Sequence, residues 1–134
     1  MSRIGVTMKR KDIDHFEKTV AQLEALQAEI TVLSKKSPND GLNEFKLTLV
    51  NTVLGEANII LGKKYMPFPN FKAFNKDDVP SNSDVTFILA QYLNCMEKLR
   101  SDNIHDILGS DWYWDVDDGE DRIRTAPPKK IGGK

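Results

Sequence analysis

The sequence has little of the residue types that build disulfides and metal sites. Cys95 is its only cysteine, which excludes an intrachain disulfide and a cluster of several thiolates within one chain. The only histidines, His15 and His105, lie far apart and form no two-histidine helical motif. We therefore predict no metal and no cofactor, and the lone cysteine favours a reducing cytoplasm as the location.

Long apolar runs and an excess of one charge are also lacking. Residues 45–61 hold the densest apolar stretch, but Lys46 and Glu56 interrupt it, and a membrane helix needs about 20 apolar residues. Residues 1–11 lack the apolar segment of a secretion signal. With 19 basic and 20 acidic residues, the chain has no overall field that attracts nucleic acid or anionic lipid. We expect neither export nor a membrane partner.

Patterns of known catalytic and metal sites are missing as well. Asp40, Glu44 and Lys46 follow the acid and acid-x-lysine order of metal-dependent nucleases, but in a helix Glu44 and Lys46 would point about 200° apart. Residues 115–121 are acidic, yet Gly119 is one position too early for the glycine of a calcium loop. We predict a protein that is not an enzyme, with no catalytic residues.

Two segments have the spacing and the caps of amphipathic helices. In residues 12–36 the apolar residues recur every three or four positions, with Asp12 as the expected N-cap. In residues 81–102, Ser81 and Asp84 form an expected capping box. The two apolar stripes comprise Ile13, Phe16, Val20, Leu23, Leu26, Ile30 and Leu33 in the first segment, and Val85, Ile88, Leu89, Tyr92, Met96 and Leu99 in the second.

Between these two segments a further helix is expected over residues 37–62, and it is apolar around much of its circumference. Ser37 is its expected N-cap, Pro38 its first residue and Gly62 its end. One apolar stripe comprises Leu42, Phe45, Leu49, Val53 and Ile60, and the other comprises Leu47, Val50, Leu54 and Leu61. Such a helix should lie centrally with neighbours on both sides, so Leu49→Ala should cost about 2–5 kcal/mol.

The loop between the second and third helices is aromatic and rich in proline. Residues 63–80 contain three prolines and four aromatic residues, which predicts an ordered loop. Tyr65, Phe68 and Phe71 either close the core or present an anchor to a partner protein. One further short helical turn is expected at residues 104–108.

The C-terminal quarter predicts a β-hairpin. Strand-like runs on either side of an Asp-Gly turn give this signal, and the alternation puts Trp112, Trp114 and Val116 on one face. Residues 127–134 form a basic tail that we expect to be flexible. The fold prediction is mainly α: one domain, residues 1–126, in which a three-helix bundle carries the aromatic loop and the small C-terminal hairpin.

Two main hypotheses of function follow, with a weaker third. The first is a small non-enzymatic intracellular adaptor or regulatory protein, which binds another protein or a second copy of itself through the aromatic loop or residues 12–36. The alternative is a nucleotide or single-stranded nucleic-acid binding module, in which the basic termini meet beside the hairpin. Its surface would comprise Trp112, Tyr113, Trp114, Arg122, Arg124, Lys129 and Lys130. Six acids within residues 111–121 would repel phosphates, which favours the first hypothesis. A hydrolase whose carboxylates converge only in space is a third class.

Overall fold

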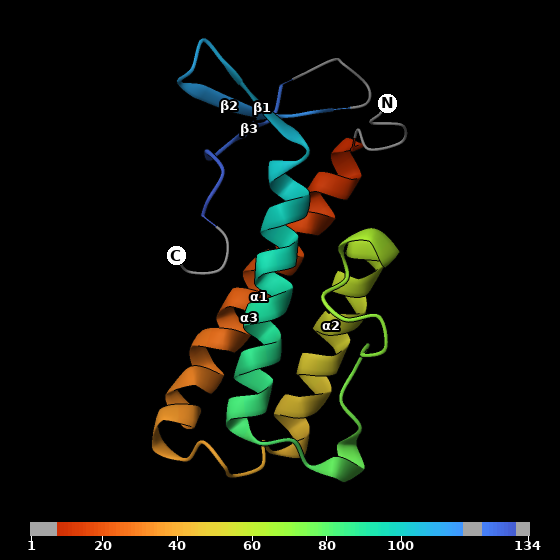
Figure 1. The fold of residues 1–134 in the computed structure, drawn as a ribbon, viewed down its shortest axis with the longest axis vertical. Helices are drawn as coiled ribbons and strands as arrows, with labels where there is room; N and C mark the ends of the chain where they lie inside the picture. Colours follow the sequence, from red (N-terminus) through yellow and green to blue (C-terminus); the bar gives the residue numbers. More distant parts are fainter. Residues whose placement is uncertain (1–7, 117–121, 131–134) are drawn as a thin grey trace.

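A computed structural model describes residues 8–116 and 122–130. Three helices form the body of the protein: α1 (Arg10–Lys36), α2 (Glu44–Tyr65) and α3 (Asn82–Ser101). α1 runs antiparallel to both α2 and α3, and a small sheet caps the end where α1 begins and α3 ends (Figure 1). The mainly helical fold, with three helices and a C-terminal hairpin, is confirmed.

α1 and α3 follow their predicted patterns. α1 begins three residues earlier than expected, because Lys9 is its N-cap in place of Asp12. The carboxylate of Asp12, in the first turn, accepts a hydrogen bond from the Lys9 amide at 3.3 Å. At the start of α3, Ser81 Oγ accepts a hydrogen bond from the Asp84 amide at 3.1 Å, as the capping box requires. The apolar stripes of both helices are buried or half-buried in the core.

The start of α2 differs from the prediction. The helix begins at Glu44, where Asn43 Oδ1 caps the Lys46 amide at 2.8 Å. Ser37 does not cap it, because the preceding turn is bonded to the start of α3 instead. Asn82 Nδ2 donates to the Ser37 carbonyl at 2.9 Å, and the backbone amides of residues 82 and 83 bond the carbonyls of residues 40 and 38. These contacts are distant in sequence, so a local capping pattern did not predict them.

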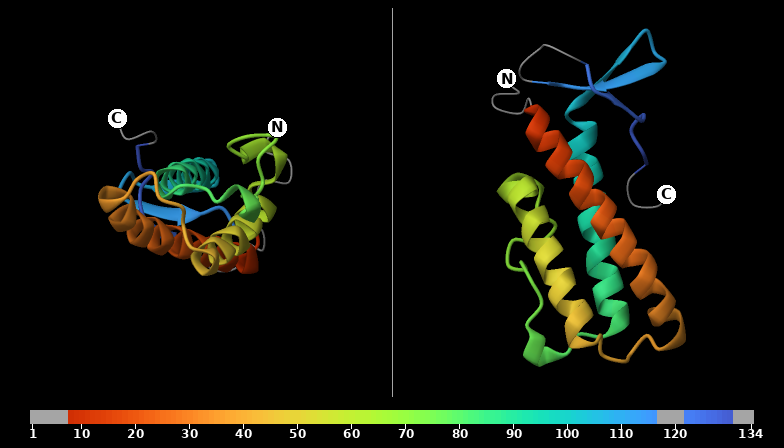
Figure 2. Two further views of the ribbon diagram at one scale, coloured as in Figure 1. Left: turned by 90° about the horizontal axis from the view of Figure 1, so that it is seen from below. Right: turned by 180° about the vertical axis from the view of Figure 1, so that it is seen from behind.

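The position of α2 also differs from the prediction. The stripe with Leu47, Val50, Leu54 and Leu61 is buried throughout. In the other stripe Leu42 and Val53 are buried and Ile60 is half-buried, but Phe45 and Leu49 are exposed. Figure 2 shows α2 on the flank of the α1 and α3 pair, so one of its faces meets those two helices and the opposite face meets none. The prediction of a central helix is therefore wrong, and Leu49 is exposed.

Gly62 bends α2 but does not end it. Its φ of 60° and ψ of −171° are non-helical, and helical structure resumes as far as Tyr65. The loop that follows returns along the length of α2 to η1 (Lys76–Asp78) (Figure 1). The Asn51 side chain holds this loop through two hydrogen bonds of 2.9 Å to the backbone of Phe74.

The sheet contains three antiparallel strands in the order β1 (Ile104–Ile107), β2 (Asp111–Trp114) and β3 (Arg124–Thr125). The predicted helical turn at residues 104–108 is wrong, because these residues pair with β2, Ile104 lying opposite Trp114. Leu108 and Gly109, both with positive φ, form the tight turn between them. The predicted pairing of β2 with β3 is confirmed, Trp112 lying opposite Thr125, while the Asp-Gly turn lies outside the described residues.

Candidate functional site

The two tryptophans of the hairpin face the helices. Trp114 is only 1 % exposed, and its ring meets Phe16 of α1 edge to face, with ring centroids 5.2 Å apart. Trp112 and Val116 lie on the same side and are half-buried against the core, as the alternation predicted. The Trp114 ring therefore fixes the sheet to the bundle and offers no face for a stacked base.

Tyr113 lies on the other face of β2 among paired charges. The Arg122 guanidinium lies 5.5 Å from the Tyr113 ring centroid. Arg124 forms an ion pair with Asp111, and His105 Nδ1 lies 2.6 Å from a carboxylate oxygen of Asp115. Because acids accompany the bases, this face has little excess positive charge to attract a phosphate backbone.

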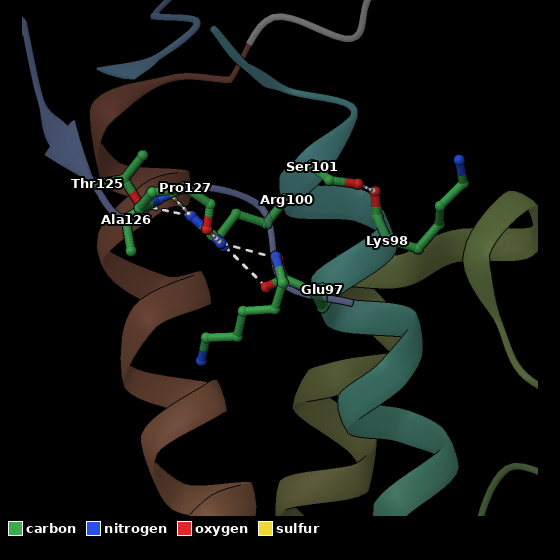
Figure 3. A network of polar contacts seen from close by, with 8 residues as sticks. Glu97, Lys98, Arg100, Ser101, Thr125, Ala126 and Pro127 are labelled. Atoms are coloured by element: carbon green, nitrogen blue, oxygen red, sulfur yellow. Dashed lines mark hydrogen bonds and ion pairs between the residues drawn. The ribbon is translucent and has the colours of Figure 1, made fainter. Parts of the chain in front are cut away.

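The C-terminal segment lies against α3 through its backbone and the Thr125 side chain. Figure 3 shows Arg100 reaching from α3 to this segment, where its guanidinium donates to Thr125 Oγ1 and to the carbonyls of Ala126 and Pro127 at 2.7–2.8 Å. Arg100 also makes a bidentate pair with Glu97, at 2.9 and 2.8 Å. Arg100 is only 7 % exposed, so a satisfied buried cation holds the segment in place.

A groove of about 410 Å³ runs between α1 and α3 beside this segment. Lys129 and Lys130 line it, together with Glu17 and Glu24 of α1. The Lys129 amide donates to Glu97 Oε2 at 2.8 Å, which places the segment at the edge of the groove. The groove therefore combines the two lysines with carboxylates, which weakens their use in a nucleic-acid surface.

The aromatic loop mostly closes the core. Phe71 packs edge to face on Phe74 and on Tyr92, with centroids 5.1 and 6.5 Å apart. Phe68 stacks on Phe87 of α3 at 6.5 Å. Tyr65 is half-buried, and its hydroxyl donates to Asp102 Oδ2 at 2.6 Å. The loop residues that we considered as a binding surface are thus engaged within the fold.

A second hollow of about 430 Å³ lies where the start of α1 meets the end of α2. His15 lines it and pairs with Glu56, with Nε2 and Oε1 2.6 Å apart. Among the described residues that line this hollow there is no serine, threonine or cysteine to serve as a nucleophile for this pair. Ile59 and Ile60 give the hollow an apolar wall.

The other residues that the sequence offered for catalysis or metal binding do not form a common site. Burial raises the pKa of the Cys95 thiol, which reduces the reactive thiolate form. Glu44 forms an ion pair with Lys76, whereas Lys46 forms one with Glu29. Within residues 8–116 and 122–130 there is no group of three or more acids, histidines or cysteines that could hold a metal ion. Most of the acidic run at residues 115–121 lies outside the described residues.

The largest feature that sequence reasoning missed is on α2. Phe45 is 72 % exposed, Leu49 42 % and Ile59 73 %. We define the exposed α2 face as Phe45, Thr48, Leu49, Thr52, Gly55, Glu56 and Ile59, which share one side of the helix at 100° per residue. The signal was present, because Phe45, Leu49, Thr52, Glu56 and Ile59 follow alternate steps of four and three, as in a helix that pairs with another helix.

None of the described helices has a stretch long and apolar enough to cross a membrane. Among known proteins, no family model, no curated sequence and no solved structure matches this chain.

Proposed function

We propose that this protein is a small non-enzymatic interaction module, an adaptor or regulator that binds protein through the exposed α2 face. The observation that carries the proposal is the exposure of Phe45, Leu49 and Ile59 along one side of a regular helix. Isolated apolar residues are common on protein surfaces, but apolar side chains that line up on one helix face indicate an interaction site. The lone Cys95 suits a reducing compartment, so we place this contact in the cytoplasm.

The polar groups of this face are already satisfied within the chain, which lowers the cost of covering it. The hydroxyls of Thr48 and Thr52 each donate at 2.9 Å to a carbonyl one turn earlier in α2. The Glu56 carboxylate is paired with His15. A partner that covers the face therefore leaves no threonine hydroxyl without a hydrogen bond, and buried unpaired polar groups are a main cost of association.

Other surfaces support binding less well. The hairpin and the aromatic loop direct most of their rings into the fold, and Arg124 beside the hairpin is paired with Asp111. The exposed α2 face instead combines large apolar side chains with a rigid helical backbone, as in helix-to-helix recognition between proteins.

Site-specific photo-crosslinking tests the proposal. With Phe45 replaced by p-benzoylphenylalanine in cells of the natural host, we expect a discrete crosslinked protein species. Ile59→Ser, a distant change on the same face, should abolish it. The matched control carries the crosslinker at Phe87, an exposed phenylalanine of α3, and should give no such species.

Either of two crosslinking results would contradict the proposed function. Equal crosslinking from the positions of Phe45 and Phe87, or crosslinking from Phe45 that Ile59→Ser leaves unchanged, would show that the exposed α2 face is not the binding surface.

A further inference from the structure

The positions that make up the exposed α2 face are spaced symmetrically before and after Thr52. Phe45 and Ile59 lie at equal distances before and after Thr52, and so do Leu49 and Gly55. A two-fold axis through Thr52 would therefore place each large side chain opposite a complementary position of an identical helix. A surface that matches itself in this way is what a symmetric dimer requires.

We propose that a second copy of this chain covers the exposed α2 face, with the two α2 helices antiparallel and crossing at Thr52. Phe45 of each copy then packs on Ile59 of the other, and Leu49 enters the space above Gly55. This inference rests on the proposed function, because it names the partner of the same surface.

The positions opposite the large side chains have room for them. Within the part of the chain that the structure describes, no heavy atom beyond the helix itself and the neighbouring residues lies within 4 Å of a Cβ built on Gly55, so the space above this glycine is open to Leu49 of the second copy. Ile59 lines the hollow of about 430 Å³ at the end of α2. The ring of Phe45 from the second copy arrives at the mouth of this hollow, and an aromatic anchor beside a pocket is typical of the residues that dominate an interface.

The charges at the ends of α2 favour the antiparallel arrangement. Glu44 lies in the first turn, and Lys63 and Lys64 lie in the last. Antiparallel helices bring Glu44 of one copy near Lys63 of the other, whereas parallel helices would place like charges side by side. The opposed helix dipoles add to this preference.

Sedimentation equilibrium of the full chain tests the dimer. We expect the mass to rise from 15.2 kDa toward twice that value across a dilution series. Gly55→Trp adds its ring in open space, so each copy should still fold, but the ring occupies the site of Leu49 from the other copy. It should weaken the dimer at least about tenfold, which corresponds to about 1.4 kcal/mol. Leu108→Ser removes an exposed apolar side chain outside α2 and should leave the dimer unchanged.

Disulfide crosslinking tests the direction and the register in a Cys95→Ala background. Thr52→Cys alone should form a covalent dimer, because the two copies of residue 52 meet at the axis. Phe45→Cys alone should not, since two copies of residue 45 lie about 21 Å apart along the helix axis. A mixture of Phe45→Cys and Ile59→Cys chains should form the mixed dimer.

The outcomes separate this inference from the proposed function. A chain that remains at 15.2 kDa at every concentration, or a Phe45→Cys chain that crosslinks to itself as readily as Thr52→Cys does, contradicts the antiparallel dimer. If photo-crosslinking at Phe45 then captures a different protein and Ile59→Ser abolishes the capture, the dimer is excluded while the proposed function stands.

Discussion

Arg100 shows how one buried charge can organise two segments. Its guanidinium makes five hydrogen bonds, to Glu97 and to residues 125–127. Arg100→Leu removes all of them and leaves the Glu97 carboxylate without its cation, so we expect a loss of about 3 kcal/mol in the free energy of unfolding. Urea unfolding measures this loss. Glu97→Gln, which keeps an oxygen to accept from Arg100, should lose less.

Arg100→Leu can also be followed by the hydrogen exchange of one backbone amide. The Lys129 amide donates to Glu97 Oε2, so its hydrogen exchange reports whether the C-terminal segment stays on α3. Exchange at Lys129 should accelerate in Arg100→Leu more than exchange at the core residue Leu89 does. An unchanged Lys129 would mean that Arg100 does not hold this segment.

Asp102 links stability to pH. Burial raises the pKa of its carboxyl, but hydrogen bonds from Tyr65 and Lys98, with the charges of Lys98 and Lys64, outweigh burial and lower this pKa. A lowered folded-state pKa contributes stability that is present above the unfolded-state value and is lost as pH falls through the folded-state value. Part of the stability at pH 7 should therefore disappear on acidification.

Tyr65→Phe tests this link. Without the hydroxyl, the pKa of Asp102 should rise toward its ordinary value, and the free energy of unfolding at pH 7 should fall by about 1 kcal/mol, since the site is partly open to solvent. Carboxyl NMR titration and urea unfolding at several pH values measure the two effects. A difference between Tyr65→Phe and the wild type that stays constant from neutral pH to below the folded-state pKa would contradict this account.

At the scale of elements, the sequence predicted a helix or strand best where the pattern of that segment alone determined its structure. α1 and α3 each have a regular apolar period, which predicted both helices, and the capping box at Ser81 fixed the start of α3. The start of α2 and the strand β1 depend instead on distant partners: the turn at Ser37 bonds Asn82, and Ile104 pairs with Trp114. Such contacts override local propensity and cannot be inferred from the pattern of one segment.

The two interior glycines of α2 should respond oppositely to alanine. Gly55 is a regular helical residue with open space around it, so Gly55→Ala should raise stability by about 0.5–1 kcal/mol. Gly62 has a φ of 60°, where a Cβ is strained, so Gly62→Ala should lower stability by about 1–2 kcal/mol. Thermal unfolding of both variants measures the signs. Stabilisation by Gly62→Ala would mean that α2 is straight there.

At the scale of the molecule, the sequence predicted that α2 is apolar on two sides but not which side faces solvent. Phe45 and Leu49 have the same residue types and spacing as core residues, so period and hydrophobicity could not distinguish an interface from a core. The distinction comes from the packing of α1 and α3 onto the stripe of Leu47 and Leu54. The alternation of residues 112–116 predicted the shared face of the two tryptophans, but the sequence could not identify Phe16 as the partner of Trp114.

The most direct test of this account compares Leu49→Ala with Leu54→Ala by urea unfolding, at a concentration low enough for the wild-type chain to be monomeric. Leu54 is fully buried, so its truncation should cost about 2–5 kcal/mol, whereas truncation of the exposed Leu49 should cost less than about 1 kcal/mol. Leu49→Ala should nevertheless reduce association at higher concentration. Equal losses of stability from the two variants would place Leu49 in the core and contradict the exposed α2 face.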